Sequence, residues 1–189
     1  PYGDLIKTRC KQLGIKSDND DIVEMDIPNQ RHSHLTQSSI KPSISSFQLL
    51  GLALKLVKPH LNFKPNTIAV TVVGFTDDIT EKVFEAVVAA IATANAEIPE
   101  YKQDKSNYKP IKLIQMFGHY VQHGYKRTLA EAEGNTLARN LSMLPPNVLT
   151  PGEYLKLVKS IARENKFKLE FYDVAELKKK KVGAFLAVA

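Results

Sequence analysis

The chain has 189 residues, 43% of them hydrophobic, which is enough for one buried core and part of a second. No stretch approaches the roughly 20 consecutive apolar residues of a membrane helix, and the single Cys10 excludes an internal disulfide framework, so the composition predicts a cytoplasmic protein without a membrane span. The formal net charge is +6, and most of the excess lies in residues 126–189, with 12 Lys and Arg against 7 Asp and Glu.

The first part of the chain alternates helical and extended patterns. Apolar residues at helical spacing predict a helix over residues 5–13, and apolar and acidic residues then alternate over 21–27, as in a half-buried strand. The polar residues 29–45 predict a loop, in which His32 and His34 are expected to lie at the surface.

Residues 46–58 predict a helix that a proline ends, and its buried side is expected to hold Phe47, Leu50, Leu54 and Val57.

A β-branched run over residues 67–73 predicts a strand covered on both faces. Asp78 and Glu81 form a capping-box pattern at the start of the next apolar helix, and residues 111–117 predict a third strand. This order favours crossover connections, so the sequence predicts an α/β fold with a mixed sheet flanked by helices.

A helix is predicted over residues 128–144, where the pair Pro145 and Pro146 must end it. Thr150 as N-cap and Pro151 in the first turn predict another helix directly afterwards.

The last elements predict the beginning of a second α/β domain. Residues 168–172 alternate as a strand, Asp173 and Glu176 would cap a short helix, and residues 182–189 resemble a buried strand. Because a native chain rarely ends inside a buried strand, we expect this second domain to be truncated.

Residue types alone predict no catalytic site. His119 and His123 have the spacing of a zinc-binding pair, but no glutamate lies between them and no third ligand is evident. Glycine-rich phosphate loops and the G-x-S-x-G pattern are missing from the sequence, and Cys10 has no recognisable histidine partner.

Two neighbouring motifs carry more information. They are Glu133-Gly134-Asn135-Thr136-Leu137-Ala138-Arg139-Asn140-Leu141 and Leu144-Pro145-Pro146-Asn147-Val148-Leu149-Thr150-Pro151. They closely resemble the segment that joins the two domains of leucyl aminopeptidases, the cytosol aminopeptidase family of metallopeptidases. The resemblance extends over residues 128–189, and the order of elements in residues 1–127 is similar to that of a bacterial branch of the family.

The resemblance implies three parts: an N-terminal α/β domain over 1–127, truncated at its start, a linking helix over 128–144, and the beginning of the catalytic domain over 145–189. It also implies that the complete protein is a homo-hexameric aminopeptidase of the cytoplasm, which removes N-terminal residues, often leucine, from peptides. Two divalent metal ions, Mn or Zn, would serve that reaction.

The family's metal ligands lie in motifs of the type Gly-Lys-Gly followed by Phe-Asp-Thr-Gly-Gly, and Asn-Thr-Asp-Ala-Glu-Gly-Arg, and none of these occurs in this sequence. No catalytic or metal-binding residue is therefore assigned, and no metal is expected on this chain. The chain alone is expected to be inactive and to serve assembly and domain linkage.

The motif residues are instead predicted to form a structural linker. They are Asn135, Arg139, Pro145, Pro146, Asn147, Thr150 and Pro151. An amide and a guanidinium four residues apart on one helical face can fasten a helix to neighbouring backbone, and two prolines give it a stiff exit.

An alternative function rests on the basic last third of the chain. Four consecutive lysines at 178–181 could bind nucleic acid, although such a run at a helix end is usually a solvated surface. A metal-free scaffold related to the peptidase is a further alternative.

Overall fold

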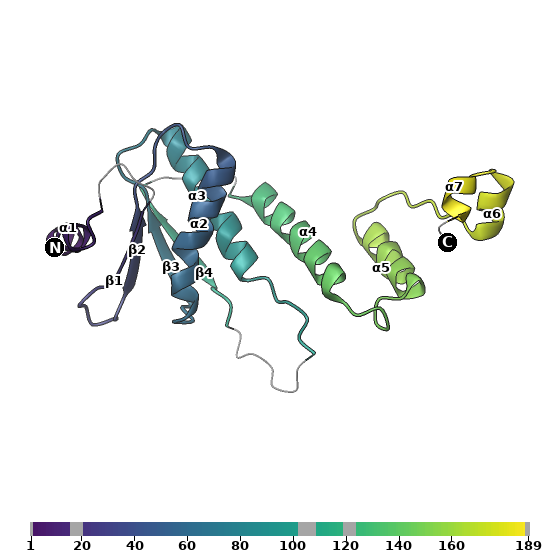
Figure 1. The fold of residues 1–189 in the computed structure, drawn as a ribbon, viewed down its shortest axis with the longest axis horizontal. Helices are drawn as coiled ribbons and strands as arrows, with labels where there is room; N and C mark the ends of the chain where they lie inside the picture. The colour runs from purple at the N-terminus through teal and green to yellow at the C-terminus, as the bar shows by residue number, and fades with distance from the viewer. Residues whose placement is uncertain (1, 16–20, 102–108, 119–123, 188–189) are drawn as a thin grey trace. The chain divides into compact units, whose positions relative to one another are not determined.

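The computed structural model describes residues 2–15, 21–101, 109–118 and 124–187 (Figure 1). Within these residues, no helix is both long and apolar enough to cross a membrane. The chain divides into two compact units, Pro1–Ser142 (unit 1) and Met143–Ala189 (unit 2).

Unit 1 begins with a helix and alternates strands and helices thereafter. Its elements are α1 (Gly3–Gln12), β1 (Ile22–Asp26), β2 (His34–Ser38), α2 (Ser46–Leu61), β3 (Thr67–Thr71), α3 (Asp77–Ala94), β4 (Leu113–Phe117) and α4 (Lys126–Met143), which ends one residue into unit 2. The predicted α/β class is confirmed, and the sequence predicts each of these elements except β2. Two details of the prediction are wrong: α2 continues past Pro59 to Leu61, and β3 is exposed on one face rather than covered on both.

The strands pair in two ways. β1 and β2 are antiparallel, with Asp26 opposite His34, whereas β3 and β4 are parallel and joined through α3. Among the described residues the strands form two sheets of two strands, so the prediction of one mixed sheet is corrected to two small ones. The loop predicted over residues 29–45 contains β2, because backbone pairing with β1 defines this strand and its own side chains are mostly polar.

The core of unit 1 lies between α2, α3 and the β3–β4 pair (Figure 1). Phe84 and Ile91 of α3 are the most enclosed large side chains, at 0% and 1% exposure. The buried cluster consists of Leu49, Ala53, Val57, Ile68, Ala86, Val87, Ala90, Ile91 and Ile111. These side chains supply the hydrophobic free energy that holds the two helices on the sheet.

The buried side of α2 differs from the predicted one. Leu49 and Val57 are buried, whereas Phe47, Leu50 and Leu54 are exposed. The helix is apolar on more than one side, so spacing alone did not show which stripe would meet α3.

Asn95 joins the end of α3 to the residues that lead into β4. Its side-chain amide donates to the carbonyl oxygen of Ile111 at 2.8 Å, and the Ile111 N–H donates to its side-chain oxygen at 2.9 Å. The crossover from β3 to β4 is therefore fixed by a side chain at its midpoint.

Unit 2 contains α5 (Pro151–Glu164), α6 (Val174–Lys179) and α7 (Gly183–Leu186). The strand predicted over 168–172 forms no ladder in the described residues, and the strand predicted over 182–189 is wrong where the structure describes it, since α7 is a helical turn there. A strand requires a partner for its backbone groups, and the described part of unit 2 offers none.

Candidate functional site

The predicted linker motif begins on α4. Asn135 and Arg139 lie four residues apart and both are exposed. Within the described residues neither side chain has a hydrogen-bond partner, so their fastening role stays a prediction.

The second half of the motif forms the turn that leads into α5. The carbonyl oxygen of Pro145 accepts from the N–H groups of Val148 and Leu149 at 2.9 and 3.0 Å. The Thr150 hydroxyl then accepts from the N–H of Glu153 at 3.3 Å, and Pro151 occupies the first turn. The predicted N-cap is therefore present, and the prolines lie outside the ladder of helical hydrogen bonds.

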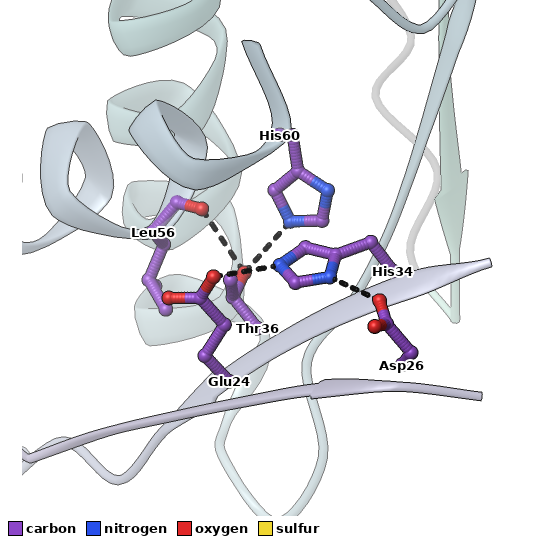
Figure 2. Close-up of polar contacts among 6 residues, drawn as sticks. All are labelled: Glu24, Asp26, His34, Thr36, Leu56 and His60. Atoms are coloured by element: carbon purple, nitrogen blue, oxygen red, sulfur yellow. Dashed lines mark hydrogen bonds and ion pairs between the residues drawn. The ribbon is translucent and has the colours of Figure 1, made fainter. Parts of the chain in front are cut away.

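The most densely connected polar site of unit 1 surrounds His34 on β2 (Figure 2). Its Nδ1 lies 2.8 Å from Asp26 Oδ1, and its Nε2 lies 3.1 Å from Glu24 Oε1. The contact with Glu24 lacks hydrogen-bond geometry and is an ion pair when the imidazole is protonated. The His34 side chain is only 8% exposed, so its prediction as a surface loop residue is wrong.

A second histidine, His60 in the last turn of α2, completes this site. Its Nε2 lies 2.9 Å from the Thr36 hydroxyl oxygen, which also lies 3.0 Å from the carbonyl oxygen of Leu56. The His34 and His60 rings meet edge to face at 5.1 Å between centroids, and Phe63 covers His34 from 4.6 Å. Residues of β1, β2 and α2 thus converge on one cluster.

The electrostatics of this cluster favour a neutral His60. Burial, and next the positive charge of His34, lower the pKa of His60 from its ordinary value of 6.5, whereas Glu24 raises it to a smaller extent. In this cluster His34 therefore lies between two carboxylates, whereas His60 is harder to protonate than an ordinary histidine.

A separate surface pocket lies between the first turns of α3 and α4. Its lining includes Asp78, Glu81, Glu85, Tyr125 and Thr128. The Thr128 hydroxyl donates to Glu85 at 2.9 Å, and burial followed by the charges of Glu81 and Glu85 raises the pKa of Tyr125. The Tyr125 phenol thus remains neutral, and the described residues that line this pocket include no histidine or cysteine that could serve as a base or nucleophile.

The described residues do not fit a metal centre. Within 2–15, 21–101, 109–118 and 124–187, no three His, Cys, Asp or Glu side chains converge closely enough to hold an ion. His119 and His123 lie outside these residues, and His32 is an exposed turn residue. The sequence did not identify His60 and Thr36 as site residues. The one signal for this cluster was that Glu24 and Asp26, and then His34 and Thr36, occupy alternate positions of two consecutive segments.

Comparison with solved structures shows which proteins share this fold. A tomato leucine aminopeptidase variant aligns with a TM-score of 0.74 and 20% identity over 98% of this chain and 38% of its own. The bottromycin maturation enzyme BotP in complex with Mn aligns with a TM-score of 0.64 and 17% identity, over 90% of this chain and 36% of its own. At these identities the likeness shows a shared α/β fold.

Sequence comparison finds similar proteins of one kind, the cytosol aminopeptidases. No protein-family model matches the chain. A probable cytosol aminopeptidase of Persephonella marina is 27% identical over 113 residues, covering 58% of this chain and 23% of the relative. One from Pseudomonas paraeruginosa is 35% identical over 95 residues, covering 47% and 19%. One from Synechococcus elongatus is 28% identical over 170 residues, covering 82% and 34%.

Over the residues that these relatives match, the chain is similar to bacterial proteins named cytosol aminopeptidases, the group that the motif resemblance implied. The chain spans between 19% and 34% of the lengths of these relatives.

Proposed function

We propose that this chain is the N-terminal domain, the linking helix and the beginning of the catalytic domain of a metal-dependent aminopeptidase, which removes N-terminal residues of the leucine type from peptides. The observation that carries the proposal is the sequence similarity to proteins named cytosol aminopeptidases, 35% over 95 residues in one case. The fold shared with a leucine aminopeptidase over 98% of this chain supports it.

The proposed boundaries are residues 1–127, 128–144 and 145–189. Their support is that unit 1 ends at Ser142 and that α4 spans Lys126–Met143, so a single helix covers the region between the proposed domains. In this assignment Asn135, Arg139 and the turn at Pro145 serve domain linkage.

The catalytic metals are proposed to be held by residues outside this chain. Two divalent ions, Mn or Zn, would activate the attacking water and stabilise the oxyanion of the tetrahedral intermediate. The lack of the family's ligand motifs in the sequence supports this division. A cytoplasmic homo-hexamer is the proposed assembly of the complete protein.

The proposal predicts that the purified 189-residue chain does not hydrolyse leucine 4-nitroanilide with added Mn²⁺ or Zn²⁺, whereas the longer product of the same gene does. The reason is that this chain lacks the carboxylates that would hold the metals. Release of nitroaniline is measured for both proteins at equal molar concentration, with a chelator as the control. Chelator-sensitive turnover by the 189-residue chain would contradict the proposed location of the ligands.

The lysines 178–181 are exposed in unit 2, and the ammonium of Lys180 lies 4.7 Å from the centre of the Tyr172 ring. An intramolecular cation–π contact of this kind suits a solvated helix end. A nucleic-acid or scaffold role stays a prediction that the aminopeptidase proposal does not require.

A further inference from the structure

Polar contacts join the hairpin formed by β1 and β2 to the last turns of α2. The main buried cluster of unit 1 draws on α2, α3, β3 and Ile111, and it contains no residue of the hairpin. Val23 of β1 is buried but lies outside this cluster. Among the described residues, the two hydrogen bonds between the hairpin and α2 both involve the Thr36 hydroxyl.

Only one arrangement of protons satisfies both of these hydrogen bonds. The Thr36 hydroxyl has a single proton, which it donates to the carbonyl oxygen of Leu56. It must then accept from the Nε2–H of His60. Neutral His60 therefore carries its proton on Nε2, and acid adds a second proton at Nδ1.

The titratable and charged groups around the His34–His60 pair come from three elements besides α2. β1 contributes the carboxylates of Glu24 and Asp26, and β2 contributes His34, which both carboxylates contact. α1 contributes Arg9, which lines the same surface pocket as Glu24, Asp26 and His34. Both carboxylates already contact His34, so a cation at His60 has little compensation.

We propose that Thr36, His60 and His34 form an acid-released latch, which holds the β1–β2 hairpin on α2 at neutral pH and lets the hairpin open when the pH falls. Protonation of His60 places a positive charge beside the His34 ring, 5.1 Å away between centroids (Figure 2). The nine-residue buried cluster of α2, α3, β3 and Ile111 remains closed, because none of its members lies on the hairpin.

The sign of the pH dependence follows from linkage. In the latched state the pKa of His60 lies below the ordinary 6.5, which the open state regains. At a pH between the two pKa values, the open state binds more protons than the latched state. The latch therefore has its full stability above pH 6.5, and it loses that stability as the pH falls through the lowered pKa of His60. Lys58 and Lys64 near this helix end are exposed, and solvent screens their charges.

Hydrogen exchange of the whole 189-residue chain tests the latch. Protection of residues 22–38 is measured relative to residues 84–91 of α3 at about pH 7.5 and about pH 5.5, with labelling times scaled for intrinsic exchange, and we expect the ratio to fall about threefold or more in acid. A constant ratio would overturn the proposal.

Two variants separate His60 from other titrating groups. His60→Gln keeps an N–H donor for Thr36 but cannot titrate, so its ratio should no longer depend on pH; a wild-type response in this variant would refute the latch. His32→Asn is the matched control, since His32 is exposed and its left-handed φ of 48° suits asparagine. It should respond like the wild type, and loss of its response would also refute the role of His60.

A direct titration makes the test independent of how the variants fold. The ring protons of His60 are followed by NMR in the unmodified chain. We expect a pKa below 6.5, and a value at or above 6.5 would overturn the latch.

Discussion

The Thr36 hydroxyl connects two elements through a single oxygen atom. It donates to Leu56 and accepts from His60, both on α2, while its own backbone pairs with Glu24 across the hairpin. Removing the hydroxyl leaves the buried Nε2–H of His60 without its acceptor, and an unmade hydrogen bond in a partly buried site costs more than the bond itself gains.

Thr36→Val should therefore lower the free energy of unfolding by about 1–2 kcal/mol, because valine preserves the shape and removes only the hydrogen bonds. Urea unfolding followed by circular dichroism measures the loss. Thr71→Val is the control, since Thr71 is exposed on β3, and its change should stay within about 0.5 kcal/mol. Equal effects of the two substitutions would argue against the hydrogen-bonded role of Thr36.

Single residues of the cluster were the hardest feature to predict from sequence. Thr36 and His60 are 24 positions apart, and Asn95 and Ile111 are 16 apart, so no local pattern links them. The N-caps Thr150 and Asp173 were predicted because their partners lie three residues away. Local hydrogen bonds leave a sequence signature, whereas contacts between elements depend on how the elements pack.

At the scale of elements, α2 offers two adjacent leucines in different environments. Leu49 belongs to the buried cluster at 7% exposure, whereas Leu50 is 42% exposed. The sequence had placed Leu50 in the core, because Phe47, Leu50 and Leu54 also recur at helical spacing. Burial thus depends on the partner surface, which is α3 and the β3–β4 pair.

Leu49→Ala should destabilise unit 1 by about 2–5 kcal/mol, since it removes buried methyl groups and leaves a cavity. Leu50→Ala should cost less than about 1 kcal/mol, because the leucine is already partly in water. The two substitutions share residue type, helix and propensity, so their difference in urea unfolding reports burial alone. A larger loss for Leu50→Ala would mean that the buried stripe of α2 is assigned to the wrong side.

The strands show what pattern analysis can and cannot find. β1, β3 and β4 were predicted from alternating or β-branched runs, and α3 connects β3 and β4 as a crossover. The segment 168–172 has the same alternation but forms no strand, because none of its backbone N–H groups donates to another described residue. A side-chain pattern shows that a segment can form a strand, but the strand forms only where its backbone groups pair with a neighbouring strand.

At the scale of the whole molecule, the two units differ in how much they bury. Unit 1 contains a cluster of nine buried apolar residues, whereas Ala162 is the one buried residue among those described in unit 2. Large side chains of unit 2 are exposed, among them Phe167, Phe171 and Phe185. Such a composition suits a segment whose apolar surface meets further polypeptide, in keeping with its proposed place at the beginning of a catalytic domain.

This difference leads to a prediction for the chain and the longer gene product. In the 189-residue chain, amides of residues 168–172 should exchange nearly as fast as those of an unstructured peptide, because they make no hydrogen bond within the described residues. In the longer product they should be protected by about tenfold or more, since a paired strand and a covered aromatic face would form there. Amides of α3 serve as the internal control and should be equally protected in both proteins. Two results would contradict the placement of these residues in the sheet of a catalytic domain. One is protection of residues 168–172 in the 189-residue chain, and the other is a lack of protection in the longer product.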